Sequence, residues 1–322
     1  MVTPTDIEAA AERIAEYVRR TPVMRLEAGA FGVDAAVSLK LELFQHTGSF
    51  KPRGAFHRIL CADIPAAGVI TASGGNHGQA VGYAARTLGL PAEIFVPEGS
   101  PPLKAERIRR HGARVTVTGR YYDDAMEACL QRASESGALL VHPYDHEQVV
   151  AGAGTAGREI EEQLPDLDTI LVAVGGGGLA AGVAAWYESR RRVVSVEPEG
   201  CPSLAAAMEA GEPVEVPVGG IAADSLGARR IGEVPFSVAK QHIAASVVVP
   251  DDAILEAQWR LWDEFRILAE PGGAASLAAL LCGAYVPEAG ESVGVIVCGG
   301  NTAALPAPPG DEPARDEPGQ QS

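Results

Sequence analysis

Apolar segments alternate with alanine-rich segments of helical period along almost the whole chain. This alternation is typical of βαβ units that build a parallel sheet, so the expected fold class is α/β. The segments that favour strands are residues 36–43, 68–73, 92–97, 113–119, 138–143, 169–174, 192–198, 246–250 and 293–299. The segments that favour helices are residues 76–88, 103–111, 121–136, 147–163, 178–190, 251–265 and 272–283.

The two ends of the chain carry their own signals. Thr3 is an expected helix N-cap, since Pro4 follows at the first helical position and Asp6 stands three residues after the cap. We expect this first helix to end before Thr21. Residues 306–322 are rich in proline and charge and have few side chains to bury, so we expect them to form a disordered tail.

Length and composition narrow the class of protein. With 322 residues, 47% of them hydrophobic, the chain can bury a sizeable core. It has no apolar run long enough to cross a bilayer and no signal-peptide pattern at its start, so we expect a cytoplasmic protein. Its five cysteines are scattered without a C-x-x-C pair, which argues against a disulfide framework and against structural zinc.

The formal net charge of −16 bears on the partners of this chain. Such a charge repels the phosphate backbone of nucleic acids and the surface of anionic membranes. We therefore expect neither nucleic acid nor membrane as a partner.

Four consecutive glycines, Gly175–Gly178, join a buried-type strand to a helix. A turn of this kind exposes backbone N–H groups at a helix N-terminus, where they hold a phosphate. We therefore expect a phosphorylated ligand. A nicotinamide-dependent dehydrogenase stays open as an alternative, because Gly175, Gly177 and Ala180 match a loose G-x-G-x-x-A and Glu197 stands where a ribose-binding acid would.

Three further stretches place polar groups at or near strand ends. "HTGSFKPRGA" (46–55) surrounds Lys51 with glycine, proline and Phe50, "TASGGNHGQA" (71–80) gathers serine, asparagine and histidine, and "VIVCGGN" (295–301) ends the last strand. Ligands of open α/β sheets bind beyond the carboxyl ends of the strands. These stretches therefore mark one candidate site.

The order of these motifs resembles the fold-type II pyridoxal-phosphate enzymes, in particular the serine/threonine dehydratase and serine racemase branch. The resemblance covers roughly residues 3–305 and is carried by "GSFKPRGA", "SGGNHGQA", "HPYDHEQVVAGAGT", "GGGGLAAG", "EPGGAA" and "CGGN". It implies an open, twisted, two-domain fold like that of the tryptophan synthase β subunit. The larger domain is expected at 1–67 and 146–305, and a smaller, mobile one at 68–145.

The resemblance also implies how the cofactor, pyridoxal 5'-phosphate, is held. Lys51 is the residue expected to join the cofactor covalently and then to act as the base. The other expected cofactor ligands are Phe50, Asn76, Gly175, Gly176, Gly177, Gly178, Leu179, Glu270 and Cys298. A thiol at position 298 cannot keep the pyridine nitrogen protonated as an aspartate would, which favours elimination over transamination.

The expected substrate is a β-hydroxy amino acid whose carboxylate meets Ser73, Asn76 and His77. The implied reaction is dehydration of L-threonine or L-serine to 2-oxobutyrate or pyruvate plus ammonia. Serine racemase, 3-hydroxyaspartate dehydratase and threonine synthase remain alternatives. Racemases of this branch carry a second serine directly after the one matching Ser73, and Gly74 stands there instead, so we expect weak or absent racemisation.

Two further features follow from the resemblance. A cation site is expected from Glu197, the carbonyl of Cys201 and Ser203. Because a serine replaces the aspartate of members that use a divalent ion, a monovalent ion such as K⁺ is the better expectation. Members of the family usually form dimers, so a homodimer is expected.

Overall fold

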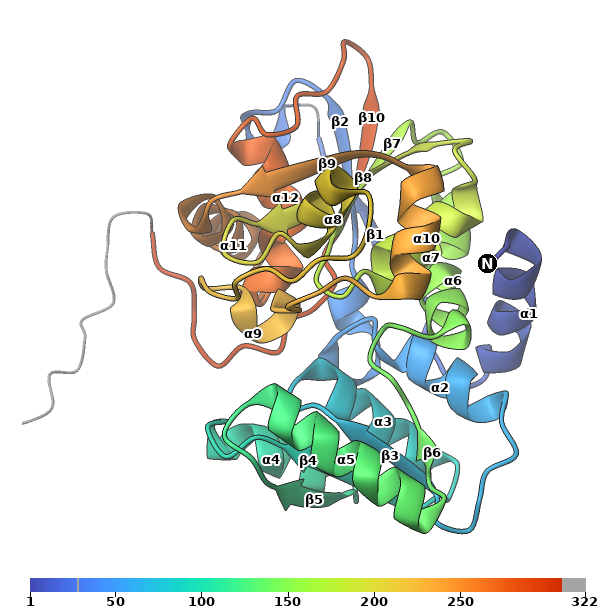
Figure 1. The fold of residues 1–322 in the computed structure, drawn as a ribbon. Coiled ribbons are helices and arrows are strands. Elements are labelled where there is room, and N and C mark those ends of the chain that lie inside the picture. Colours follow the sequence, from blue (N-terminus) through green and yellow to red (C-terminus); the bar gives the residue numbers. More distant parts are fainter. Residues whose placement is uncertain (28, 309–322) are drawn as a thin grey trace, which may run out of the picture.

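The computed structural model describes residues 1–27 and 29–308, and within them the larger sheet has six strands. Their order across the sheet is β1 (Val23–Arg25), β2 (Ala36–Lys40), β10 (Ser292–Ile296), β7 (Thr169–Ala173), β8 (Arg192–Pro198) and β9 (Ile243–Val249). β1 is antiparallel to β2, and the other neighbours are parallel. β2, β10 and β7 are neighbours and run parallel, so the segments that follow these three strands leave the same edge of the sheet (Figure 1).

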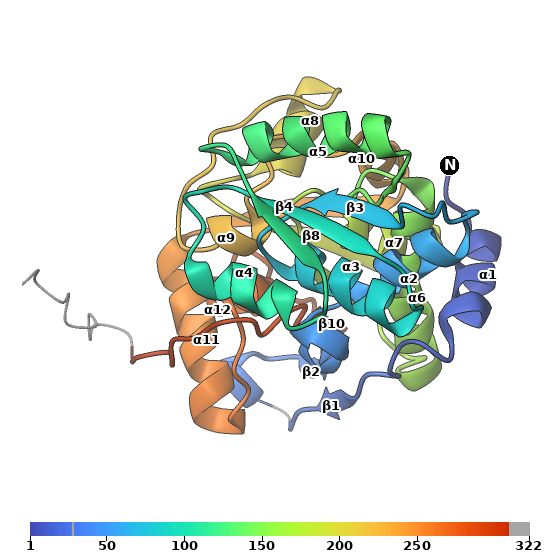
Figure 2. The ribbon, with the colours of Figure 1, turned by 90° about the horizontal axis from the view of Figure 1, so that it is seen from below.

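A second sheet of four parallel strands lies below the first in Figure 1 and faces the viewer in Figure 2. Its order is β5 (Arg114–Val117), β4 (Ala92–Val96), β3 (Val69–Ala72) and β6 (Leu139–Leu140). These strands fall inside the expected inserted segment 68–145, and those of the larger sheet fall outside it. Strands and helices alternate along the chain, and every strand pair except β1–β2 is parallel. Both sheets are open, and the expected α/β class is confirmed. That this smaller unit, residues 68–145, moves as a body stays a prediction.

Helices cover both sheets (Figure 1). Around the larger sheet α6 packs on α7 and α11 on α12, while α3, α4 and α5 contact the smaller sheet. The helices are α1 (Pro4–Ile14), α2 (Pro52–Leu60), α3 (Asn76–Thr87), α4 (Pro102–Arg109), α5 (Tyr122–Ser136), α6 (Glu147–Gln163), α7 (Gly178–Tyr187), α8 (Ser203–Ala210), α9 (Ala223–Leu226), α10 (Glu233–His242), α11 (Asp251–Phe265) and α12 (Pro271–Leu281). Short 3-10 turns occupy η1 (Ala30–Gly32), η2 (Glu42–Phe44) and η3 (His46–Gly48).

The expected start of the first helix is confirmed. The Thr3 hydroxyl accepts the N–H of Asp6 at 3.3 Å, and the Asp6 carboxylate accepts the N–H of Thr3 at 2.9 Å, so both halves of a capping box are present. The helix ends at Ile14, earlier than its apolar pattern suggests.

Several elements carry no periodic signal in the sequence. β1 has only three residues, too few to show an alternation. α2 is buried on nearly every side, including Arg53 and His57, so it presents no apolar stripe against a polar face. α10 contains Pro235 in its first turn. These three elements, with α8 and α9, were not expected from the pattern.

The hydrophobic cores show how the two sheets are joined. The main core fills the larger sheet and its helices. A second cluster combines α1 and α2 with β3 and α3, and Tyr17 stacks on Phe56 there with ring centroids 5.2 Å apart. Because α2 carries Lys51 at its start, the smaller sheet packs directly against the segment that bears the amine.

The expected disordered tail, 306–322, lies mostly outside the described residues, which end at 308. Within residues 1–27 and 29–308, no helix combines the length and the apolar character needed to cross a bilayer.

Candidate active site

The glycine turn follows β7 and begins α7. Gly177 has a φ of +90°, a left-handed conformation that a glycine adopts without strain, and the helix starts at the next residue. Because the first N–H groups of a helix have no partner within it, this turn offers donors and the positive end of the helix dipole. A Cβ on Gly176 would collide with the ring of Tyr144, so the turn is closely covered from that side.

Lys51 stands at the N-cap position of α2, just before Pro52. Two contacts tie its neighbourhood to the end of β10: Ser49 forms a bridge with Gly299, and the N–H of Phe50 donates to the carbonyl of Cys298 at 3.1 Å. The Lys51 amine donates to the carbonyl of Pro143 at 2.9 Å and lies 5.0 Å from the centre of the Phe50 ring. The turn therefore holds this amine between the two sheets.

Burial sets the protonation of the groups around this amine. It lowers the pKa of Lys51 to about 8, against a smaller opposing effect of Cys298 and Glu270. Burial raises the pKa of Cys298 to about 12 and that of Glu270 to about 7. The site therefore combines an amine that loses its proton near neutral pH with a neutral thiol.

Asn76 connects the smaller sheet to the ends of the larger one. It begins α3, and its Nδ2 donates to Oε1 of Glu270 at 2.5 Å. Its Oδ1 accepts from Nδ2 of Asn301 at 2.7 Å. Asn301 follows Cys298 by three residues, and the sequence motifs predict no role for it, although its position just after a strand end is a signal for one.

Ser73 and His77 lie on either side of the α3 start. The Ser73 hydroxyl accepts the N–H of Gly75 at 3.2 Å. The His77 ring is buried and bonded to the carbonyl of Val141 at 2.9 Å, and burial with the nearby Lys51 lowers its pKa to about 3. The imidazole is therefore neutral and turned into the smaller unit, which leaves the main-chain N–H groups of the helix start to face an anion.

A buried ion-pair network lies behind Lys51. Arg53, which is 0% exposed, donates from Nε and Nη2 to both carboxylate oxygens of Glu42 at 2.8 Å, and from Nη1 to Glu159 at 2.8 Å. Lys40 donates to Glu159 at 2.7 Å and to the carbonyl of Thr21 at 3.0 Å. The network fastens the first turn of α2 to β2 and α6. The sequence gives no sign of it, because it depends on how distant segments pack.

The residues expected to bind a cation lie together beneath the glycine turn. Glu197 is 0% exposed, and its two oxygens accept the N–H groups of Leu204 and Ala205 at 2.7 Å each. The Ser203 hydroxyl donates to the carbonyl of Gly175 at 2.8 Å. Burial raises the pKa of Cys201 to about 11. Among the described residues, no three His, Cys, Asp or Glu side chains gather as metal ligands.

The position of Glu197 also bears on the dehydrogenase alternative. That interpretation requires a carboxylate that meets a ribose at a strand end. Glu197 is instead enclosed, and both of its oxygens already accept main-chain N–H groups of α8. The structure counts against this alternative.

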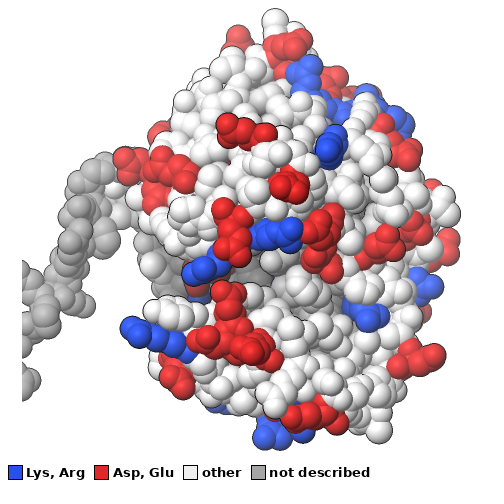
Figure 3. Space-filling model, viewed as in Figure 1, with Lys and Arg blue, Asp and Glu red and all other residues white. Residues whose placement is uncertain are grey.

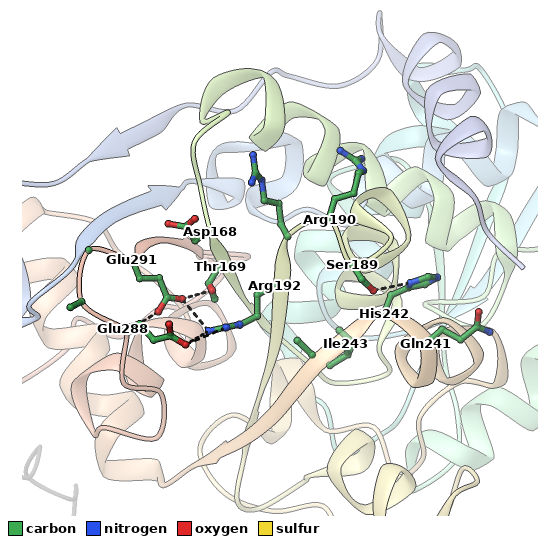
Figure 4. A pocket seen from close by; sticks show the side chains of 14 residues that line it. Asp168, Thr169, Ser189, Arg190, Arg192, Gln241, His242, Ile243, Glu288 and Glu291 are labelled. Carbon is green, nitrogen blue, oxygen red and sulfur yellow. Dashed lines mark hydrogen bonds and ion pairs between the residues drawn. The ribbon is translucent and has the colours of Figure 1, made fainter.

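A separate groove of about 640 Å³ lies at the amino ends of β7 and β8, opposite the glycine turn (Figure 4). Its charged side chains already have partners. The Arg192 guanidinium lies 3.4 Å from Glu288 and 3.7 Å from Glu291, Arg190 pairs with Glu161, and Arg191 donates to the carbonyl of Pro165. Acidic side chains predominate over basic ones across the face in Figure 3, in keeping with the net charge. This groove does not gather free groups toward a ligand in the way the candidate site does.

Comparisons by family model, by sequence and by structure all match this chain to proteins of one family. A family model described as pyridoxal-phosphate dependent enzyme matches residues 14–299. An L-threonine ammonia-lyase of Geobacter sulfurreducens is 38% identical over 306 residues, which cover 94% of this chain and 76% of that protein. Among solved structures, maize serine racemase and a T.th. threonine deaminase each superpose with a TM-score of 0.88 at 34% identity, covering 94% of this chain and 94% and 100% of theirs.

The residues of the site fit a phosphorylated pyridine aldehyde. The Lys51 amine can attach to an aldehyde, and the N–H groups at the start of α7, which have no partner within the helix, suit a phosphate. The Ser49 hydroxyl, next to Phe50, is fully buried and has no hydrogen-bond partner among the described residues. A buried hydroxyl of this kind indicates a polar neighbour at the site.

Proposed function

Because the chain belongs to the family of pyridoxal-phosphate-dependent enzymes, we propose that it is a threonine/serine dehydratase. It converts L-threonine to 2-oxobutyrate and ammonia, or L-serine to pyruvate and ammonia. The observation that carries this proposal is the Lys51 amine, held between the two sheets with its pKa lowered to about 8. Its similarity to an L-threonine ammonia-lyase over 94% of the chain supports the choice of reaction.

Residues from both units hold the cofactor. The N–H groups from Gly175 to Leu179 at the start of α7 would hold the phosphate, and Phe50 would pack beside the ring. Cys298 is the residue that would meet the ring nitrogen, and Asn76 the one that would donate to the ring oxygen. When bound, pyridoxal phosphate supplies a covalent site for an amino group and an electron sink for the electron pair released at the neighbouring carbon.

Lys51 attaches the cofactor and later moves a proton. Because burial favours its neutral form, the free amine is far more abundant near pH 7 than in an exposed lysine. The same Nζ would also take the substrate's Cα proton as general base. The carbonyl of Pro143 orients this nitrogen.

Cys298 accounts for elimination as the preferred outcome. Its thiol is neutral because burial raises its pKa to about 12, so it would put no negative charge against the ring nitrogen of the bound cofactor. A neutral partner does not keep that nitrogen protonated, which leaves a weaker electron sink. Elimination suits such a site, because the departing hydroxyl carries electrons away.

The start of α3 receives the substrate carboxylate. Main-chain N–H groups at Asn76 and His77, with the Ser73 hydroxyl, provide the donors. Gly74 offers no side chain for proton transfer on the opposite face, and a Cβ there would meet Ser100 Oγ and a Val96 methyl at 3.2 Å each. This supports dehydration over racemisation, despite the likeness to serine racemases.

The proposal is tested by product analysis on the purified protein. With L-threonine or L-serine as the sole substrate, we expect equal amounts of ammonia and 2-oxo acid, and no interconversion of L- and D-serine at a comparable rate. Borohydride should fix the cofactor to the peptide that contains Lys51. Lys51→Ala should lower the rate by about 10³-fold or more, since it removes both attachment and base. Turnover at an undiminished rate in that variant would refute the proposal.

The cation, the quaternary structure and the location complete the proposal. A monovalent ion such as K⁺ would lie near Glu197, whose pKa burial raises to about 7 and which a cation would keep ionised. Replacing K⁺ by a bulky organic cation should then lower activity, and unchanged activity would remove the site. We also propose a cytoplasmic homodimer, and sedimentation of the purified protein tests its size.

A further inference from the structure

Asn301 links three segments that surround the site. It lies beyond β10, and its Nδ2 donates at 2.7 Å both to the carbonyl of Thr47, ahead of Lys51, and to Oδ1 of Asn76, at the start of α3. Both hydrogens of this amide nitrogen are therefore engaged. One of them fixes the side chain of a cofactor ligand in the proposed function.

The main-chain carbonyl of Thr47 determines which end of the Asn301 amide is the donor in these two hydrogen bonds. A carbonyl can only accept, so the group of Asn301 that faces it must be the NH₂. The second hydrogen of that NH₂ then points at Asn76, where it requires the oxygen of the amide. Asn76 consequently turns its NH₂ away from Asn301 and toward Glu270.

Glu270 closes the arrangement on the other side. Its Oε1 accepts from Nδ2 of Asn76 at 2.5 Å, and its main-chain N–H donates to the carbonyl of Gly299 at 3.1 Å. Two glycines permit this close approach. A Cβ on Gly299 would collide with the Glu270 carboxylate, and a Cβ on Gly48, whose φ is +76°, would lie 2.8 Å from Oδ1 of Asn301.

We propose that Asn301 is a positioning residue that holds the Asn76 amide with its NH₂ toward the cofactor oxygen. Glu270 takes one hydrogen of that NH₂, and the other is left for the cofactor. If the amide were turned over, its carbonyl oxygen would oppose the cofactor oxygen, acceptor against acceptor. This inference rests on the proposed function, in which Asn76 contacts the cofactor.

The Asn301→Asp variant tests this orientation, because a carboxylate has nearly the same shape as the amide but donates nothing. It loses the bonds to Thr47 and Asn76 and attracts the Asn76 NH₂, which favours the turned amide. The affinity for pyridoxal phosphate should fall about tenfold to a hundredfold, as expected for a mispaired buried hydrogen bond. The visible absorption band of the bound cofactor should shift, and the midpoint of its pH titration should move.

A second variant and a neighbouring control separate orientation from folding. Asn301→Ala removes the two donors without adding charge, so it should weaken cofactor binding less than Asn301→Asp. Thr302→Val alters the next residue, whose hydroxyl bonds locally to Ala304, and should leave affinity and spectrum unchanged. Thermal unfolding without cofactor measures the purely structural effect of each change.

The possible outcomes are distinct. Wild-type affinity and spectrum in both Asn301 variants would overturn the inference, and so would a loss of thermal stability with an unaltered spectrum. If the wild-type protein forms no borohydride-reducible link at Lys51, the proposed function fails, and the inference with it. A shifted spectrum in Asn301→Asp, with Lys51 still attached, supports both.

Discussion

The Lys51 amine donates to the main-chain carbonyl of Pro143 at 2.9 Å, across 92 residues of chain. A carbonyl oxygen carries only a partial negative charge, so it orients the amine without stabilising the ammonium as a carboxylate would. Burial therefore dominates and brings the pKa down from 10.5 to about 8. The amine is held in place, and a substantial fraction of it is free to react near neutral pH.

Covalent attachment of the cofactor to the apoenzyme should follow this pKa. The rate should rise with pH and level off above about 8, since Lys51 must lose its proton before it attacks. A shift from 10.5 to about 8 raises the fraction of free amine near pH 7 by about 300-fold over that of an exposed lysine. Stopped-flow absorbance with pyridoxal phosphate measures this rate.

An exposed lysine supplies the reference for that experiment. Free Nα-acetyl-lysine in the same buffers should show a rate still rising beyond about pH 10, in line with its ordinary pKa. An attachment rate in the protein that keeps rising to the same pH would show that the site does not depress the Lys51 pKa.

The glycine turn predicts a steric effect at one position. In Gly176→Ala the new methyl group would collide with the Tyr144 ring, so either the turn or the ring must move. We expect affinity for pyridoxal phosphate to fall by at least about tenfold, because the displaced N–H groups no longer converge on the phosphate. Equilibrium titration of the apoenzyme provides the measurement.

The double variant Gly176→Ala, Tyr144→Ala identifies the cause. Removing the ring makes room for the methyl group, so affinity should recover beyond that of Gly176→Ala. Tyr144→Ala alone is the matched control. If the double variant binds no better than the sum of the two single changes predicts, contact with Tyr144 does not explain the need for glycine at this position.

Those contacts also show what the sequence could and could not predict. The glycine turn and Cys298 directly follow strand ends, and Lys51 follows β2 after two 3-10 turns. A parallel sheet brings its strand ends together, so local motifs sufficed to group these residues. The contacts of Pro143 and Tyr144 depend on how the return from the smaller sheet lies against distant turns. No periodicity encodes that, and the inward turn of the His77 ring was missed for the same reason.

The Arg53 network should matter for stability more than any exposed ion pair. Arg53→Met leaves Glu42, which is 0% exposed, without its two charged hydrogen bonds. Breaking a buried pair in this way costs about 3–5 kcal/mol. We expect the free energy of unfolding from urea titration to fall by that amount, and the double variant Arg53→Met, Glu42→Gln to recover part of it.

A surface pair provides the comparison for this loss. Arg20 lies 3.3 Å from Glu162, and both side chains are well exposed, at 59% and 41%. Arg20→Ala should change stability by no more than about 0.5 kcal/mol. Equal losses in Arg53→Met and Arg20→Ala would mean that the buried network adds no stability of its own.

Contacts between the two units at the mouth of the site predict how substrate is retained. Lys104 on α4 pairs with Asp224 on α9, and the Arg107 guanidinium lies 3.5 Å from the carbonyl of Asn301. If the smaller unit closes over the substrate, Lys104→Ala should raise KM for L-threonine by up to about fivefold, the range of an exposed ion pair, with little change in kcat. The effect should shrink in high salt, because the pair is accessible to solvent.

Arg110→Ala is the matched control for that variant. Arg110 pairs with Glu106 four residues earlier in the chain. The substitution therefore removes a positive charge, as Lys104→Ala does, but breaks no contact between the two units. Steady-state kinetics at two salt concentrations should separate the two variants, since only Lys104→Ala loosens closure. If both raise KM equally, the effect reflects net charge near the entrance, and closure through Lys104 and Asp224 is refuted.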